Sequence, residues 1–513
     1  MAEDVRSGDA IVREMVALAP ADCAPTGDLL EQLHGLTEEL LASYRAEGKL
    51  VESPMALAME RSVDLAEDEA RSALAGRRVM VTGGAGCVGT RLIPLLARLG
   101  AREIAIVDFA DDPSDTPDAV SETCARRYFQ VDIRDVPALD ATFALFRPEV
   151  VFHLASVREP GRAEAVVREA IETNVLATRN MIEACLRHDV ADAIYSSTGK
   201  CFAYVTSHVY TGSKKLAEAQ WVAASRASTT TRFRFTRFTH VMENGIITAD
   251  ILNGIDDGLV GLHGPDRNFN VQNLVQATHL LVNALALADS TPADGFWSAV
   301  DLGWPVNTLE LALYNIQQSG KRAAVRFLGV PKGYDEMFFR GQFSWAPGIE
   351  YHPLINALEA LDSYTDASGT MTGARIQSFV PARLEAEIAK VEAALADATL
   401  DAEQVKKAML ASVAGFTRAI FEQTPLNDLV DILWWGAAPD WAGEDFELAR
   451  RFSPIIVLLA DVIAERLESG LDAAPTEGMS AQLADIATTL FALGNQGALA
   501  GRLGSAMRHR AAA

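Results

Sequence analysis

A tyrosine and a lysine with three residues between them are suited in type and spacing to proton transfer. Tyr210 and Lys214 lie in the stretch VYTGSKK, shortly after the apolar run ADAIYSST. Residues at i and i+4 share one face of a helix, so the ammonium can lie near the phenol. A phenol has an ordinary pKa of about 10 and needs a nearby cation to act as a base near neutral pH. We therefore predict that Tyr210 takes the proton of a substrate alcohol and that Lys214 activates it.

Further polar side chains precede this pair. Lys200 lies ten residues before Tyr210 and is a second candidate acid or base. Ser197 and Thr198 close the apolar run, and either hydroxyl can hydrogen-bond the substrate oxygen. Because ligands gather beyond the carboxyl ends of parallel strands, we expect these groups to surround a substrate.

The stretch VMVTGGAGCVG, residues 79 to 89, places glycines between a predicted strand and a predicted helix. Gly83 permits a tight turn, Gly86 lets the backbone approach a pyrophosphate, and Gly89 lets helix and strand pack closely. Thr82 ends the strand just before the turn. The phosphates would meet the amino end of the helix, so the pattern predicts a dinucleotide site.

Acidic residues close the next two predicted strands. Asp108 follows Gly89 by nineteen residues and is placed to accept hydrogen bonds from the ribose hydroxyls. Its charge repels a 2'-phosphate, so we predict NAD over NADP. Asp132 and Ile133, in VDIRD, are predicted to contact the adenine amine and to cover the adenine ring.

The elements that would position these groups alternate between strand and helix. Strand-like runs occur at RRVMVT, EIAIVD, YFQVDI, EVVFHLAS and ADAIYSST, with helical patterns such as VPALDATFALF between them. This alternation predicts an α/β fold, a Rossmann-like doubly wound parallel sheet with helices on both faces. Residues 1–75 read as an acidic helical region, residues 76–375 as the NAD-binding domain with a small substrate lobe mainly after residue 240, and residues 376–513 as a C-terminal helical domain.

Composition excludes several classes of function. The chain has 513 residues and a net charge of -24, which argues against a nucleic-acid partner. The five cysteines form no C-x-x-C pair, and the histidines show no metal-binding spacing, so we expect neither disulfides nor a metal. The first residues lack the pattern of a signal peptide, and no apolar run is long enough to span a membrane. We expect a soluble protein of the reducing cytoplasm.

Several of these stretches together resemble the extended short-chain dehydrogenase/reductases. The resemblance rests on TGGAGCVG, DIRD, HLAS at 153 to 156, NVLATRNMIEAC from Asn174, and YTGSK. Within that superfamily the chain is most similar to the capsular-polysaccharide type of nucleotide-sugar 4,6-dehydratases and epimerases, on the stretches REAIETNVLATRN, STGKC and FWSAVDLGWPVNTLELA. The resemblance covers roughly residues 76 to 340 and implies a homo-oligomer.

The resemblance assigns roles to individual residues. It implies a Ser/Thr-Tyr-Lys triad, with Thr198 favoured over Ser197, and a ribose contact by Lys214. The cofactor contacts it implies also include Cys87, Val88, Ala155 and Asn174. In the 4,6-dehydratases an Asp and a Lys side by side act on a 4-keto sugar: the Lys removes the C5 proton and the Asp protonates the departing C6 hydroxyl.

Gly199 is the main departure from that pattern, since the Lys is kept as Lys200 but the acid is absent. Loss of general acid catalysis typically lowers a rate by 10² to 10⁴-fold, so the departure favours epimerisation or simple oxidoreduction over dehydration. Cys201, Tyr204 and His208 are alternative acids, although packing roles are more common for such residues.

The substrate half departs further. Arg158 stands where the family often has Lys, and His240 where it often has Asn. Arg237 and Arg267 are candidate contacts for a diphosphate, as is Lys332, with surface salt bridges as the alternative. We therefore predict an NAD-dependent oxidoreductase that transiently oxidises a ring alcohol of a nucleotide-linked sugar. The alternatives are an NAD-dependent reductase or dehydrogenase of a small-molecule alcohol, and a non-catalytic NAD-binding scaffold.

Overall fold

The computed structural model describes residues 6–111, 124–244, 246–470 and 472–511. The chain divides into two compact units. The first unit comprises Met1–Asp64, Thr239–His279 and Ala299–Asp335, and the second comprises Leu65–Phe238, Leu280–Ser298 and Glu336–Ala513. Residues 1–5 of the predicted N-terminal region lie outside the described residues.

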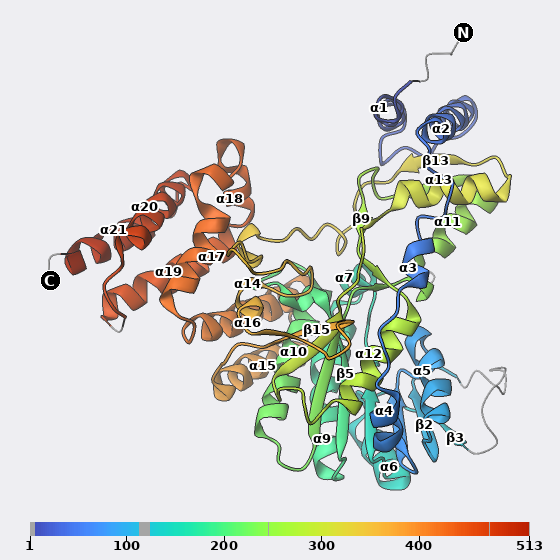
Figure 1. The fold of residues 1–513 in the computed structure, drawn as a ribbon. Coiled ribbons are helices and arrows are strands. Elements are labelled where there is room, and N and C mark those ends of the chain that lie inside the picture. The colour runs from blue at the N-terminus through green and yellow to red at the C-terminus, as the bar shows by residue number, and fades with distance from the viewer. Residues whose placement is uncertain (1–5, 112–123, 245, 471, 512–513) are drawn as a thin grey trace. The chain divides into compact units, whose positions relative to one another are not determined.

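The second unit contains a large, mainly parallel sheet (Figure 1). Across the described part of the chain, its nine strands follow the order β14-β15-β11-β6-β5-β4-β1-β2-β3. The strands are β1 (Arg78–Thr82), β2 (Glu103–Asp108), β3 (Ala125–Gln130), β4 (Val150–His153), β5 (Asp192–Thr198), β6 (Arg232–Phe238), β11 (Gly295–Ala299), β14 (Ser363–Thr365) and β15 (Met371–Arg375). The order 3-2-1-4-5-6 reverses between β1 and β4, and such a reversal creates a ligand-binding crevice. The predicted doubly wound sheet is confirmed.

Helices link these strands and cover the sheet. Their bounds are α4 (Glu67–Leu74), α5 (Cys87–Arg98), α6 (Val136–Phe146), α7 (Pro160–Ala165), α8 (Val167–Ile171), a π-helical turn η1 (Glu172–Leu176), α9 (Ala177–Arg187), η2 (Gly199–Phe202), α10 (Val209–Ala227), η4 (Arg340–Gln342) and α14 (Ala357–Ala360). Helix α5 packs against β1 and β2, and α10 packs against β5 and β6. Strands β4 and β5 are buried almost throughout, because helices cover both faces of a doubly wound sheet.

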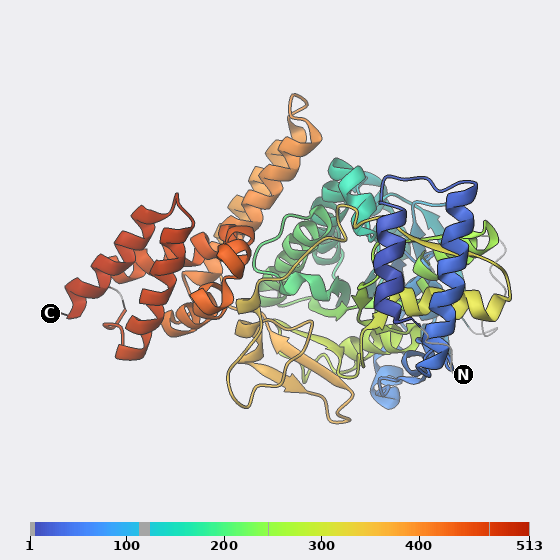
Figure 2. The same ribbon diagram turned by 90° about the horizontal axis from the view of Figure 1, so that it is seen from above.

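The last part of the second unit is helical, as the sequence predicts (Figure 2). Its elements are α15 (Pro381–Ala396), α16 (Ala402–Phe421), α17 (Leu426–Ala437), η5 (Pro439–Trp441), η6 (Glu444–Phe446), α18 (Glu447–Arg451), α19 (Ser453–Ser469), α20 (Glu477–Ala492) and α21 (Gly497–Ala511). Helix α16 packs on α10, where Gly212 leaves room for Met409. These helices share one apolar core with the sheet and the helices that cover it.

The first unit joins N-terminal helices to the predicted substrate lobe. Its elements are α1 (Gly8–Leu18), α2 (Asp28–Ala46), α3 (Ala56–Glu60), β7 (His240–Val241), η3 (Met242–Asn244), α11 (Ile246–Asp256), β8 (Leu259–Leu262), β9 (Asn268–Phe269), β10 (Val271–Gln272), β12 (Val306–Asn307), α13 (Thr308–Ser319) and β13 (Ala324–Phe327). Helix α12 (Leu274–Ala286) runs from the first unit into the second. Apolar residues of α1 and α2, such as Ile11 and Leu40, share a core with Val260 and Val325.

No helix in the described ranges is both long and apolar enough to cross a lipid bilayer.

Candidate functional site

The glycine turn between β1 and α5 has no room for larger residues. Gly83 adopts a φ of 68°, and a Cβ there would lie 2.7 Å from the Ala155 nitrogen at the end of β4. A Cβ on Gly89 would lie 2.5 Å from the Gly84 oxygen. Gly86 immediately precedes α5, whose first residues are Cys87 and Val88. The bare backbone of the turn and the amino end of α5 therefore fit a pyrophosphate.

Thr82 lies beneath the turn. It is fully buried, and its hydroxyl lies 2.8 Å from His153 Nδ1 on the neighbouring strand β4. Burial, with a smaller contribution from the charge of Lys214, lowers the pKa of His153 to about 3, so the imidazole is neutral. The Ala155 N–H also donates to the Thr82 hydroxyl, at 3.4 Å. Thr82 thus fixes the turn against β4.

Asp108 ends β2 beside the same turn. Its Oδ2 accepts from the Ala85 N–H (3.1 Å), and its Oδ1 accepts from the Ala110 N–H (3.3 Å). The carboxylate is therefore held next to the glycines, where a ribose would lie in a dinucleotide site. Its geometry fits the predicted NAD contact.

The other predicted cofactor residues have local partners. Asp132 is hydrogen-bonded to Arg134, which lowers the pKa of its carboxyl, and Ile133 is buried in the core. Asn174, in the π-helical turn, accepts from the Val157 N–H at 2.8 Å and donates to Ser213 Oγ at 3.0 Å. The buried amide thus joins the loop after β4 to helix α10.

The predicted catalytic residues meet at the carboxyl end of β5. Thr198 ends β5, and Tyr210 lies in the first turn of α10. The Thr198 hydroxyl lies close enough to the Tyr210 phenol to act on its pKa. Burial raises the pKa of Tyr210 to about 12, although the Thr198 hydroxyl and the charge of Arg158 act in the opposite direction. The phenol is therefore neutral at pH 7 without a further cation beside it.

Lys214 lies one helical turn further along α10. Its ammonium donates to the Ser196 carbonyl oxygen at 2.9 Å and lies 4.4 Å from the centroid of the Tyr195 ring. Burial lowers the pKa of Lys214 to about 8. Its predicted role as activator of Tyr210 stays a prediction.

Lys200 has an acidic neighbour that the sequence analysis missed. Its Nζ lies 3.2 Å from Oε2 of Glu336, whose side chain is only 6% exposed. The hydroxyls of Thr206 and Thr211 donate to the Glu336 carboxylate, and His208 Nδ1 lies 3.6 Å from its Oε1. Burial opposes ionisation of Glu336, but the hydrogen bonds of His208, Thr206 and Thr211 and the charge of Lys200 outweigh it and lower its pKa to about 2. No local pattern in the sequence singles out Glu336.

Gly199 is explained by Leu354. A Cβ at position 199 would lie 2.0 Å from Leu354 Cδ2 and 2.9 Å from its Cγ. The Leu354 carbonyl oxygen accepts from Arg237, and the nearby Asn356 side chain donates to the Phe202 carbonyl oxygen. The segment that carries Leu354 is thus fastened to the loop after β5.

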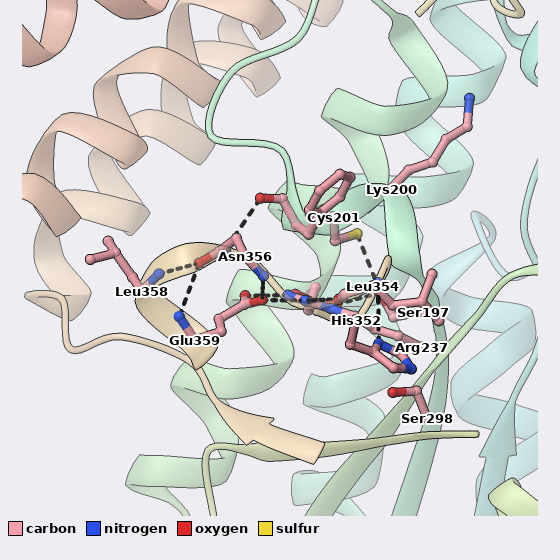
Figure 3. A network of polar contacts seen from close by, with 12 residues as sticks. Ser197, Lys200, Cys201, Arg237, Ser298, His352, Leu354, Asn356, Leu358 and Glu359 are labelled. Atoms are coloured by element: carbon pink, nitrogen blue, oxygen red, sulfur yellow. Dashed lines mark hydrogen bonds and ion pairs between the residues drawn. The ribbon is translucent and has the colours of Figure 1, made fainter. Parts of the chain in front are cut away.

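Arg237 lies in the interior of a buried network (Figure 3). Its guanidinium lies between two buried carboxylates, 2.6 Å from Glu218 Oε1 and 2.7 Å from Glu359 Oε2. Ser197 also donates to Glu218, at 2.6 Å. Lys200 extends away from this network in Figure 3. Arg237 is 1% exposed, so its donors stabilise the interior, which differs from the diphosphate contact that we expected.

The remaining predicted substrate residues do not all lie in one unit. Arg158 is exposed in the second unit, and its charge acts on Tyr210. His240 and Arg267 belong to the first unit. The His240 ring packs edge-on against Phe269 (centroids 5.1 Å apart), and Arg267 is exposed beside Asp266. Substrate contacts by these residues stay predictions.

The strand order, the glycine turn and the Tyr-x-x-x-Lys helix are those of an extended short-chain dehydrogenase/reductase. Residues 79–337 match the polysaccharide biosynthesis protein family, and the chain belongs to that family.

Individual relatives are distant. The chain is 24% identical over 282 residues to the capsular polysaccharide biosynthesis protein CapD of Staphylococcus aureus. This match covers 52% of this chain and 46% of that protein. It is 28% identical over 171 residues to a dTDP-glucose 4,6-dehydratase of Neisseria meningitidis, and this match covers 30% of this chain and 46% of that protein. The chain thus spans about half the length of these relatives.

A solved structure shares the fold. The X-ray structure of Pen from Bacillus thuringiensis superposes with a TM-score of 0.50 at 17% identity, covering 59% of this chain and 87% of that chain. At this identity the similarity concerns the fold alone.

Proposed function

We propose that this chain is an NAD-dependent oxidoreductase that transiently oxidises a ring alcohol of a nucleotide-linked sugar. The observation that carries the proposal is that Thr198 ends β5 and Tyr210 lies in the first turn of α10, with the Thr198 hydroxyl close enough to act on the phenol, in the same parallel sheet as the glycine turn. A paired hydroxyl and phenol in that crevice can hold one substrate oxygen and exchange its proton.

The turn residues fit NAD. Gly83, Gly86 and Gly89 would receive the pyrophosphate and Asp108 the ribose, and the charge of the Asp108 carboxylate would repel a 2'-phosphate. When bound, NAD accepts a hydride from the ring carbon and can return it. The names of the relatives support a sugar nucleotide as the substrate class, since one of them acts on dTDP-glucose.

The chain's own residues would handle the proton. Thr198 Oγ1 would hold the substrate oxygen, and Tyr210 would take its proton and give it back. With a pKa raised to about 12 by burial, the Tyr210 phenol favours the protonated form, which suits donation to a keto oxygen. Removal of the alcohol proton needs a cation nearby, and Lys214, one helical turn away, is the residue we assign to that task.

Dehydration is the less favoured reaction of this class. A departing hydroxyl needs a proton donor. The dehydratases have an Asp at the position of Gly199, and in this chain the Leu354 side chain occupies the space that a side chain there would take. Epimerisation, in which the hydride returns to the same carbon, needs no such donor. The same feature also favours a second candidate, a reductase or dehydrogenase of an alcohol in which the cofactor leaves after each turnover.

The experiment starts from purified protein. Denaturation should release bound NAD, and incubation with UDP- and dTDP-linked sugars should give a product of unchanged mass. A product lighter by one water would show a dehydratase, and turnover only with added cofactor would show the second candidate. Tyr210→Phe should abolish turnover, whereas Tyr351→Phe, at a tyrosine that is 60% exposed, should not. Full activity of Tyr210→Phe would refute the assignment.

A further inference from the structure

The acidic partner of Lys200 has a different origin from the one that the dehydratase pattern implies. Position 199 is a glycine, so it supplies no carboxylate to Lys200, and the Leu354 side chain occupies the space that a Cβ there would take. Glu336 instead approaches Lys200 from a segment 136 positions further along the chain, at 3.2 Å. Lys200 thus has an acidic neighbour that comes from a distant part of the chain.

The surroundings of Glu336 keep it charged. Two hydroxyls, those of Thr206 and Thr211, donate to its oxygens, and His208 and Lys200 supply the nearby positive or proton-donating groups. The carboxylate is therefore an anion at neutral pH and cannot act as a general acid. A buried anion is stabilised when a cation lies beside it, and Lys200 is that cation.

We propose that Glu336 is a positioning residue which pairs with the Lys200 ammonium and orients it, so that Lys200 donates a hydrogen bond to the substrate instead of removing a proton from a sugar carbon. This inference rests on the proposed function. An ammonium has no free electron pair, so it cannot accept a carbon-bound proton. It can still donate to a ring hydroxyl or keto oxygen, and with its side chain 29% exposed Lys200 is accessible to a ligand.

The atoms that move in the reaction are then few. The substrate hydroxyl would give its proton to Tyr210 and take it back, while the bound cofactor would supply the hydride chemistry at the carbon that bears this hydroxyl. No carbon-hydrogen bond next to the oxidised carbon breaks. Lys200 forms and loses only hydrogen bonds during this cycle.

Chemical labelling tests the positioning role without substrate. Trace acetic anhydride acetylates only uncharged amines, and mass spectrometry of peptides gives the rate at each lysine. Glu336→Gln should increase acetylation of Lys200 at least threefold. Lys406 is a matched control, because it pairs with Glu164 at 2.6 Å in the same unit. Its rate should not change in Glu336→Gln and should rise in Glu164→Gln.

Folding of the variants is checked by thermal melting. If Glu336→Gln does not fold, Glu336→Asp, which keeps the charge on a shorter side chain, should give a smaller increase at Lys200. Equal acetylation of Lys200 in the wild type and in the folded variant would overturn the positioning role.

Turnover in D₂O tests the role of Lys200 in the reaction. The product should carry no deuterium on a ring carbon, whereas deuterium next to the oxidised carbon would show proton removal from carbon and overturn the inference. Such a result would leave an NAD-dependent sugar enzyme intact. Conversely, absence of bound NAD and of any turnover would refute the proposed function, while the labelling result would still stand.

Discussion

Leu354 occupies the space that a side chain at position 199 would fill, since a Cβ on Gly199 would lie 2.0 Å from Leu354 Cδ2. Gly199 does not adopt the left-handed backbone conformation that favours glycine. The constraint at this position is therefore space, and it comes from a residue more than 150 positions later in the chain.

Gly199→Ala should destabilise the protein by about 1–3 kcal/mol, because a methyl group there overlaps Leu354. The double variant Gly199→Ala/Leu354→Ala should be less unstable than the sum of the single variants, with a coupling energy of about 0.5–3 kcal/mol. Urea unfolding gives the free energy of unfolding of the wild type, the two single variants and the double variant. Gly501→Ala is the control, because nothing lies within 4 Å of a Cβ there. Additive effects at 199 and 354 would contradict the contact.

Asp108→Asn should weaken NAD binding and reduce the preference for NAD over NADP. The amide keeps one acceptor for the turn but loses the charge, and a hydrogen bond to a charged group contributes about 1.5–3 kcal/mol. We expect the Kd for NAD to rise by about 10-fold or more, as measured by calorimetry on nucleotide-free protein. Asp111→Asn, at an exposed acid bonded to Gln130, should not change it. Equal losses in both variants would argue against a ribose contact.

His153 should make the protein less stable as the pH falls. In the unfolded chain a histidine has an ordinary pKa of about 6.5, whereas burial lowers the pKa of His153 to about 3 in the folded protein. Between pH 6.5 and pH 3 the unfolded state binds the extra proton, so stability decreases by up to about 1.4 kcal/mol per pH unit.

His153→Gln removes the titrating imidazole, so the free energy of unfolding should depend less steeply on pH. Urea unfolding at pH 7, 6 and 5 measures the slope of the two proteins. The variant should be less stable at pH 7, since the bond to Thr82 is altered. Parallel curves for the two proteins would show that His153 does not contribute to the acid sensitivity.

Arg237→Met should act on stability and not on substrate affinity alone. Removal of the guanidinium leaves Glu218 and Glu359 as buried, unpaired acids, and breaking such a network destabilises a protein by about 3–5 kcal/mol. Additional replacement of both acids by Gln should recover most of the loss, because the buried charges are then gone. Unfolding in urea measures this series. A stable Arg237→Met with only a raised KM would instead support the substrate contact predicted from sequence.

Local features were predictable from the sequence. The glycine turn and Asp108 follow from strand and helix patterns over some thirty residues, within which turn geometry and side-chain periodicity fix the structure. The helix VPALDATFALF coincides with α6, and ADAIYSST contains β5, for the same reason. The meeting of Thr198 and Tyr210 also follows from one strand and the helix after it.

The tertiary structure alone decided which distant side chains surround these groups. Glu336 meets Thr206 across 130 positions, and Arg237 meets Glu359 across 122. Leu354 likewise reaches Gly199 from a loop that has no sequence periodicity. The sequence by itself determined the dinucleotide turn, the parallel sheet and the Tyr210 helix, because short-range backbone preferences specify them. The acid beside Lys200 and the closure at Gly199 depend on how distant segments pack, and no local pattern encodes that.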